Sequence, residues 1–269
     1  MQRPSGSGCT KFVFGSLFPP YTYQIGASME KTVTEAIKYR RSVRVYKEEP
    51  IDPDRVKACI ANAVLAPTSS NLQLWEFYQV TDPGVKAKIV QACMNQPAAA
   101  TARQLVVVVA RKDKWRGRVK ANLDFLKAGF GKKSKSEYTR REKFVLSYYS
   151  KIMPSLYTDF LGILGLLKYV AFNIVGVFRP MYRQVRASDM RIVAHKSAAL
   201  AAENFMLSMA AIGYDTCPME GHDSLRIKKA LGLPYGAEIN MVIGCGIRKP
   251  EGVYGPRFRV PFEQVYKRV

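Results

Sequence analysis

The sequence predicts an α+β fold, and two kinds of segment predict it. Three stretches, 75–80, 105–110 and 238–246, have the composition of strands, with many β-branched or aromatic residues and no Pro. Around them, apolar residues recur at helical spacing, most extensively over 192–212. The chain has 269 residues, of which 48% are hydrophobic, so it can bury a sizeable core.

Short helices alternate with extended segments in the first part of the chain. We expect a helix over 34–39, an extended piece over 43–46, a helix from Pro53 that ends at Pro67, a strand over 75–80 and a helix over 85–93. Pro53 favours a first helical turn, where its missing N–H would be unpaired anyway, whereas Pro67 cannot continue a helix. The sequence Asp82-Pro83-Gly84 has the composition of a turn.

Longer elements are expected in the second part. The run 105–110 is continuously apolar and β-branched, which predicts a strand buried on both faces. The segment 192–212 is apolar almost all round, so we expect a buried central helix that Gly213 ends. After it we expect a loop over 216–223, a helix over 224–231 closed by Gly232, and a strand over 238–246.

The N-terminal residues and the cysteines indicate how the chain is divided and which sites it lacks. Residues 1–28 are aperiodic, and we interpret them as a flexible or misassigned extension. Residues 29–269 then form a single domain with a basic, apolar insert at about 111–190. Five cysteines and two histidines show no metal-ligand spacing, so we expect no metal site. Free thiols fit a reducing compartment, and we expect a cytoplasmic protein.

The chain is strongly basic, with a formal net charge of +21 and a pI near 9.9. This predicts an anionic partner, which can be nucleic acid, a phospholipid surface or a phosphorylated ligand. The sequence has no zinc-finger spacing and no RNA-recognition box, so we do not expect nucleic acid.

Much of the excess charge lies in the insert, where 111–191 holds 19 Lys or Arg against 6 Asp or Glu. Within it, 160–178 is nearly all apolar, but three glycines and Lys168 argue against a membrane span. The segment therefore either packs over a site or rests on a membrane surface. We favour a lid that also allows peripheral membrane contact through 155–185.

Two polar motifs precede the first strand. Arg40-Arg41-Ser42-Val43-Arg44 offers guanidinium forks and a hydroxyl, which suit a phosphate. Pro67-Thr68-Ser69-Ser70-Asn71-Leu72-Gln73 offers amides and hydroxyls, which suit a flat polar ring. Together they could hold a phosphorylated, ring-bearing cofactor. In the alternative interpretation, the arginines only end a helix and the second motif is only a loop.

With these motifs, the order of parts resembles the flavin-dependent nitroreductase family. The arginine motif resembles the family's opening phosphate motif, and 67–75 resembles its Pro-Ser-Ser-x-Asn-x-Gln-Pro-Trp segment. Pro218-Met219-Glu220-Gly221-His222-Asp223 resembles its Pro-Ile-Glu-Gly-Phe-Asp loop, and Arg257-Phe258-Arg259 takes the place of its closing basic pair. The resemblance covers roughly 30–110 and 190–260.

The resemblance implies a fold and an activity. The fold would be a mixed central sheet ringed by helices, in an intertwined homodimer with the 192–212 helix at the interface. The activity would be ping-pong hydride transfer from NADH or NADPH, through FMN, to a small acceptor such as a nitroaromatic or quinone. Two alternatives stay open: a non-catalytic basic protein that binds membrane or nucleic acid, and a specialised flavoenzyme of the dehalogenase or flavin-destroying type.

The resemblance also assigns site residues. Arg40, Arg41, Ser42, Arg44, Arg257 and Arg259 would hold the FMN phosphate and ribityl chain. Pro67, Thr68, Ser69, Asn71 and Gln73 would come from the other subunit along the isoalloxazine, and Asn95, Pro218, Met219, Glu220 and Gly221 would lie near the ring. The Glu220–Gly221 backbone would be at flavin N5, so no side chain is assigned a catalytic role.

Four positions need separate comment. Leu74 replaces the usual Pro, so the start of the strand at 75 is expected to be less rigid. The insert is longer than the family's helical excursion, which puts the substrate class in doubt. We interpret His222 as a loop residue, and Cys217 as a small buried residue.

Overall fold

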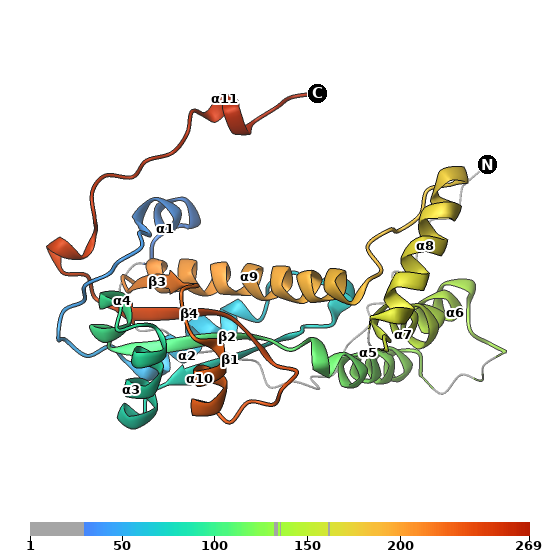
Figure 1. Cartoon of the computed structure of the whole chain (residues 1–269), viewed down its shortest axis with the longest axis horizontal. Coiled ribbons are helices and arrows are strands. Elements are labelled where there is room, and N and C mark those ends of the chain that lie inside the picture. The colour runs from blue at the N-terminus through green and yellow to red at the C-terminus, as the bar shows by residue number, and fades with distance from the viewer. Residues whose placement is uncertain (1–29, 132–133, 135, 161) are drawn as a thin grey trace, which may run out of the picture.

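The computed structural model describes residues 30–131, 134, 136–160 and 162–269 (Figure 1). Residues 1–28, interpreted above as an extension, lie outside this part of the chain. The α-helices are α1 (Val33–Tyr39), α2 (Pro53–Ala63), α3 (Pro83–Ala92), α4 (Pro97–Ala100), α5 (Trp115–Gly129), α6 (Arg140–Ser147), α7 (Met153–Tyr157), α8 (Ile163–Phe178), α9 (Ala187–Ala211), α10 (Ser224–Ala230) and α11 (Phe262–Val265). The strands are β1 (Trp75–Val80), β2 (Gln104–Ala110), β3 (Asp215–Met219) and β4 (Glu238–Gly246). Four short helical turns are η1 (Ser69–Asn71), η2 (Lys112–Lys114), η3 (Tyr148–Ile152) and η4 (Pro250–Gly252).

The four strands form one sheet in the order β1-β2-β4-β3. All three strand pairs are antiparallel. Within the described residues the sheet is therefore antiparallel and not mixed as expected, and the parallel contact is an isolated bridge between Ser42 and Thr216. Every residue of β2 is buried, which confirms the strand covered on both faces that its β-branched run predicts.

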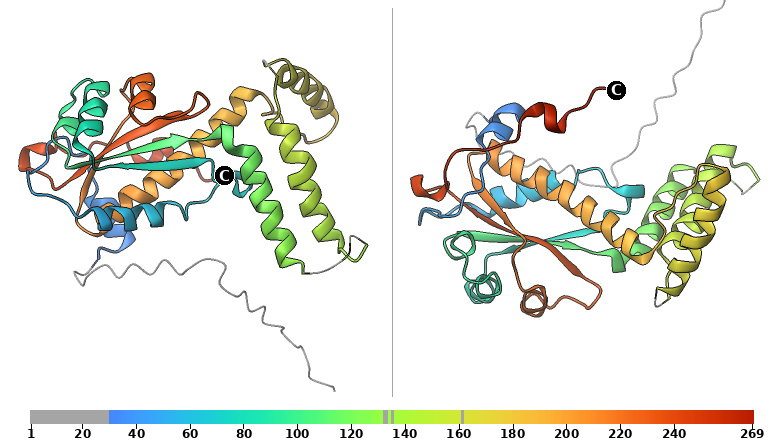
Figure 2. Two further views of the ribbon diagram at one scale, coloured as in Figure 1. Left: turned by 90° about the horizontal axis from the view of Figure 1, so that it is seen from below. Right: turned by 45° about the horizontal axis from the view of Figure 1, so that its top comes forward.

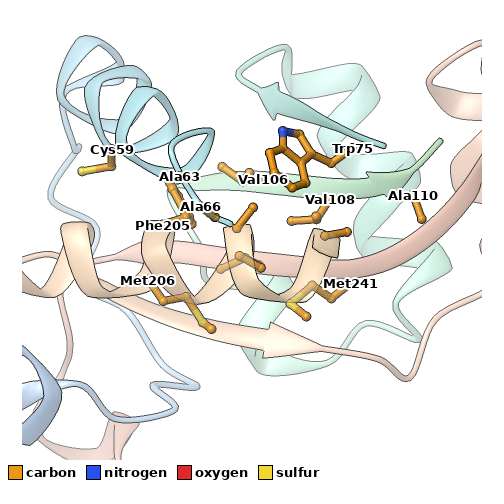
Figure 3. Packing of buried hydrophobic residues seen from close by; sticks show 14 of the residues in the cluster. Cys59, Ala63, Ala66, Trp75, Val106, Val108, Ala110, Phe205, Met206 and Met241 are labelled. Atoms are coloured by element: carbon orange, nitrogen blue, oxygen red, sulfur yellow. The ribbon is translucent and has the colours of Figure 1, made fainter. Parts of the chain in front are cut away.

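Helices cover both faces of this sheet (Figure 2). On one face, α9 and α2 pack over a core that includes Trp75, Phe205 and Met241 (Figure 3). On the other, α3 and α10 close a second core around Ile89 and Ile227. The long helix α9 is therefore buried along one side, rather than all round as its composition predicts, and Ile192 and Leu200 are exposed on its other side.

The extended piece after α1 lies beside β3. The Val43 N–H donates to the Thr216 carbonyl at 3.1 Å, and the Arg44 N–H donates to the Gly252 carbonyl at 2.8 Å. Gly252 is required here, because a Cβ at this position would lie 2.3 Å from the Val45 carbonyl oxygen. The arginine motif is therefore held between the sheet edge and the segment that leads to the C-terminus.

Several element boundaries differ from those expected. Helix α2 ends at Ala63, before Pro67. Helix α9 begins at Ala187 rather than at residue 192, because the Asp189 carboxylate accepts the Arg186 N–H at 3.0 Å and caps an earlier first turn.

The expected loop over 216–223 is wrong for its first part. Residues Asp215–Met219 form β3, and only the residues after Met219 leave the sheet. The strand includes Pro218, which an edge strand tolerates because, apart from the bridge between Ser42 and Thr216, no strand among the described residues pairs with its outer side.

The basic segment between β2 and α9 is helical and lies at one end of the molecule. Figure 1 shows α5, α6, α7 and α8 gathered beside the N-terminal end of α9, with α8 pointing away from the sheet. Among the helices of the described residues, none combines the length and the apolar character that crossing a membrane requires.

Candidate functional site

The two predicted basic motifs come together in one cleft of about 160 Å³. Among the described residues, five arginines and no acidic side chain line it. The predicted residues found there are Arg40, Arg41, Ser42, Arg44, Arg257 and Arg259. Motifs that are more than 200 residues apart in the chain thus meet at the edge of the sheet, as the resemblance implies.

Hydrogen bonds to main-chain carbonyls position two of these arginines. Arg257 donates to the carbonyls of Lys38, at 3.1 Å, and of Arg40. Arg41 donates to the Gly255 carbonyl at 2.8 Å. These contacts hold the C-terminal segment against the end of α1. The cleft therefore forms only when the motif at 40–44 and the motif at 257–259 come together.

Of the other three arginines, Arg40 is ion-paired, with its Nε 3.8 Å from the Glu203 carboxylate, whereas Arg44 and Arg259 have no ion pair among the described residues. Arg44 lies over the ring of Tyr254, with 5.0 Å between the guanidinium carbon and the ring centroid. Among the hydrogen bonds of the described residues, Arg259 donates to the carbonyl of the preceding Phe258 alone, at 2.7 Å. Arg259 is thus an exposed cation that holds no other element in place.

The cleft concentrates positive charge. Partial burial, and then the nearby cations Arg259, Arg41 and Arg40, lower the pKa of Arg257. A bound anion would offset this repulsion at Arg257. A phosphate matches both the charge and the fork geometry of this group.

Strand β3 connects this cleft to the predicted Pro-Met-Glu-Gly loop. Its first residues bridge Ser42, and its last residue precedes Glu220 and Gly221. Five residues of strand span roughly 15 Å. The predicted phosphate and ring contacts therefore lie at the two ends of one short strand.

Two of the polar atoms on this segment are buried without a hydrogen-bond partner among the described residues. They are Thr216 Oγ1, in β3, and His222 Nδ1, in the following loop. Burial lowers the pKa of His222, which fits a neutral loop residue. Cys217 is buried and burial raises the pKa of its thiol, which confirms its interpretation as a small buried residue.

The loop after β3 packs against the segment between α3 and α4. The Gln96 side-chain amide donates to the Gly221 carbonyl at 2.7 Å, and the Asp223 N–H donates to the Ala92 carbonyl at 2.8 Å. Asn95 is exposed next to Gln96. The structure therefore brings the neighbourhood of Asn95 to the Glu220–Gly221 backbone.

Unusual backbone conformations mark the predicted ring-binding segments. Among the described residues, every non-glycine residue with a positive φ lies in one of two of these segments. They are Ser70, Asn71, Gln73, Met94 and Asn95. Left-handed backbone is costly for such residues, and it clusters where a binding site requires it.

The stretch from Pro67 to Gln73 does not line the arginine cleft of its own chain. It lies against the helical segment instead, where Ser70 Oγ and the Tyr148 hydroxyl are 2.6 Å apart. Asn71 donates to the side-chain oxygen of Asn122 in α5 at 2.9 Å. One chain therefore holds two separate parts of the predicted site.

A second cavity, of about 410 Å³, opens beside this stretch. Its lining is largely apolar and includes Ser69, Tyr157, Phe172 and Tyr182. The cavity joins the predicted ring-binding stretch to α7 and α8, so the helical segment forms one of its walls.

Tertiary contacts add residues that the motifs do not reveal. Tyr254 lines the arginine cleft, and its position directly before Gly255 and Arg257 is the only sequence signal for it. Gln96 and Tyr148 have no such signal. Leu74, at the usual Pro position, is buried, so core packing rather than a proline ring fixes the start of β1.

Comparison with known proteins agrees with this geometry. The sequence profile of the nitroreductase family matches residues 37–247. The chain belongs to the nitroreductase family, whose members are flavin-dependent NAD(P)H oxidoreductases.

Individual relatives are distant but cover most of the chain. Protein DrgA from Synechocystis is 26% identical over 215 residues, which are 80% of this chain and 83% of DrgA. The solved structure of ydfN from Bacillus subtilis has a TM-score of 0.65 and 26% identity, over 88% of this chain and 98% of ydfN. A protein from Exiguobacterium sibiricum, solved in complex with FMN, has a TM-score of 0.62 and 20% identity, over 90% and 99% of the two chains.

Proposed function

We propose that this protein binds FMN and catalyses ping-pong transfer of a hydride from NADH or NADPH to a small electron-poor acceptor. The observation that carries this proposal is the cleft with five arginines at the edge of the sheet. It is the place where two sequence motifs of the family converge, and the Exiguobacterium relative binds FMN.

The residues of the cleft fit a phosphate ester. Arg40, Arg44 and Arg259 supply guanidinium donors, and Ser42 supplies a hydroxyl. Arg257 and Arg41 shape the cleft through their carbonyl contacts and add charge. Hydrogen bonds between charged partners are the strong ones, so these residues would dominate cofactor affinity.

The ring would extend along β3 toward Gly221. When bound, FMN supplies the redox chemistry, accepting a hydride at N5 and passing it to the acceptor. The Gly221 N–H would donate a hydrogen bond at the N5 edge, and Asn95, Pro218 and Met219 would lie nearby. No side chain of this chain is required as an acid, a base or a nucleophile.

The remaining ring contacts would come from a second subunit. Pro67 to Gln73 lie outside the arginine cleft of their own chain, which supports a site completed across a homodimer. Helix α9 exposes Ile192 and Leu200, each about half exposed, on the face that would meet the partner. An interface of this kind buries apolar surface and the cofactor together.

The acceptor would enter through the cavity beside Ser69. Its tyrosine-rich, apolar lining suits an aromatic acceptor such as a nitroaromatic or quinone. The nicotinamide would use the same space before the acceptor arrives, as ping-pong exchange requires.

Anaerobic reduction of the purified, FMN-loaded protein tests this function. NADH or NADPH should bleach the flavin absorbance, and addition of a nitroaromatic or quinone should restore it without oxygen. Protein that binds FMN but is reduced by neither nicotinamide would contradict the proposed activity.

A further inference from the structure

Helix α8 turns its polar side chains toward the protein and its apolar side chains outward, which is the reverse of an ordinary surface helix. Its two polar side chains, Lys168 and Asn173, are half-buried on the side toward the rest of the protein. The Lys168 ammonium donates to the carbonyls of Ser155, at 2.9 Å, and Thr158, at 2.7 Å. Polar groups that water would satisfy on an ordinary helix are satisfied here by the protein.

The outward face of α8 is apolar throughout its length. Leu167 is 61% exposed, Ile174 59%, Val177 76% and Phe178 83%, and Val170 is half exposed. Surface helices of globular proteins turn such residues inward. A contiguous apolar face of this kind marks an interaction surface.

The orientation of α8 is fixed, so rotation cannot hide this face. Arg183 donates to the side-chain oxygen of Asn173 at 2.8 Å and to the Gly176 carbonyl. A Cβ on Gly176 would lie 2.7 Å from the Arg183 guanidinium, so glycine allows this contact. On the same inner side, the Gly165 N–H donates to the Asp159 carboxylate at 2.7 Å.

The charge around α8 indicates what covers the face. Residues 111–191 hold 19 Lys or Arg against 6 Asp or Glu. Arg179 and Arg183 are exposed at the C-terminal end of α8, which projects from the body in Figure 1. The homodimer proposed above is assigned to the outward face of α9, with Ile192 and Leu200, and not to this face of α8. An anionic bilayer complements both features, because its headgroups attract cations and its acyl boundary accepts apolar side chains.

We propose that α8 docks the protein on an anionic phospholipid bilayer, lying in the interface with its outward apolar face inserted and the exposed Arg179 among the headgroups. The helix has 16 residues, which suits a position in the plane of the interface. The proposal rests on α8 alone and is independent of the flavin chemistry. It places the apolar cavity beside Ser69, which Phe172 of α8 also lines, next to the bilayer.

Vesicle co-sedimentation of the full-length, flavin-loaded protein tests the proposal. Wild type should bind mixed phosphatidylcholine–phosphatidylglycerol vesicles, should bind less at high salt, and should not bind phosphatidylcholine alone. The triple variant Leu167→Ser, Val170→Ser, Ile174→Ser should bind about tenfold more weakly. Leu225→Ser, which changes an exposed leucine on α10, is the matched control and should bind like wild type.

A second variant reports insertion directly. Trp75 and Trp115 are buried, so a tryptophan introduced by Leu167→Trp can be distinguished from them. Its emission should shift to shorter wavelength when anionic vesicles are added.

Three results would overturn the proposal. The first is failure of the wild-type protein to bind anionic vesicles at low salt. The second is a triple variant that binds these vesicles as well as wild type does. The third is a Leu167→Trp variant that sediments with the vesicles but shows no shift of its tryptophan emission. If light scattering without lipid shows a lower mass for the triple variant, and vesicle binding is absent, α8 meets another copy instead.

Discussion

At the residue scale, the arginines of the cleft differ in whether they also hold other parts of the chain in place. Arg257 holds three main-chain carbonyls as well as facing the cleft, whereas Arg259 contacts only its neighbour. Substitution of Arg257 therefore changes both structure and charge, and substitution of Arg259 changes mainly charge. The two residues are equivalent in the sequence motif, and only the structure distinguishes them.

Arg259→Ala should weaken FMN binding by about 1.5–3 kcal/mol, the range for hydrogen bonds to charged groups. This corresponds to roughly a 10- to 150-fold higher Kd in fluorescence titration. The melting temperature of the flavin-free protein should stay unchanged, because Arg259 holds no other element. Arg141→Ala, at an exposed arginine of α6, is the control and should leave FMN affinity unaltered.

His222 should make the fold sensitive to acid. Burial lowers its pKa below the usual 6.5, so the unfolded chain takes up a proton at higher pH than the folded chain. Stability is then fully present above about pH 6.5 and falls as the pH drops from there to the lower folded pKa. His222→Phe should reduce the loss of unfolding free energy between neutral and mildly acidic pH in urea titrations. An equal loss in variant and wild type would show that His222 does not titrate in this way.

The motifs predict the residues of the cleft but not their partners. Charge and spacing in the sequence indicate Arg40 and Arg44, because clustered guanidinium groups suit a phosphate, whereas Arg257 is indicated by the family resemblance. Tyr254 and Gln96 stay hidden, since their roles depend on contacts that only the folded chain creates. Three of the five left-handed residues, Ser70, Gln73 and Met94, also stay hidden, because their residue types do not favour a positive φ.

At the element scale, strands with β-branched or aromatic runs can be predicted from the sequence, whereas an edge strand that forms through pairing cannot. The expected strands 75–80 and 238–246 are confirmed at their bounds, and 105–110 lacks only Gln104. The sequence predicts a loop over 216–223, whereas Asp215–Met219 form β3. It becomes a strand through pairing with β4, a tertiary effect that local sequence does not encode.

Substitution of Gly252 tests the contact that holds the arginine motif beside β3. Gly252→Ala places a Cβ 2.3 Å from the Val45 carbonyl oxygen, so it should lower the unfolding free energy by about 1–3 kcal/mol. FMN affinity should fall as well, because Arg44 is held through the Gly252 carbonyl. In contrast, Gly117→Ala meets no atom within 4 Å inside α5 and should stabilise the protein by about 0.5–1 kcal/mol. A neutral Gly252→Ala variant in denaturant titrations would mean that this close approach does not constrain the fold.

At the scale of the whole molecule, we propose that two chains complete the site. The cleft with the arginines and the stretch with Ser69 and Asn71 are separate in one chain. The C-terminal tail, with exposed Phe258 and Phe262, extends away from the body of its own chain (Figure 1). Both features favour a partner subunit that completes the site.

We expect a homodimer that carries FMN. Size-exclusion chromatography with light scattering should give twice the mass of the 30.2 kDa chain, with flavin absorbance in the same peak. Leu200→Glu, on the outward face of α9, should weaken the dimer and release flavin together, whereas Leu225→Glu should do neither. A monomer that retains FMN would contradict the shared site.

The central claim is that the cleft with five arginines binds the phosphate of FMN. Its most direct test compares FMN with riboflavin, which has the same ring and no phosphate, by calorimetric titration of wild type and of Arg259→Ala. Wild type should prefer FMN by at least tenfold, and Arg259→Ala should lose most of this preference while its affinity for riboflavin stays the same. Equal affinity of wild type for the two flavins, or an undiminished preference in Arg259→Ala, would contradict the account.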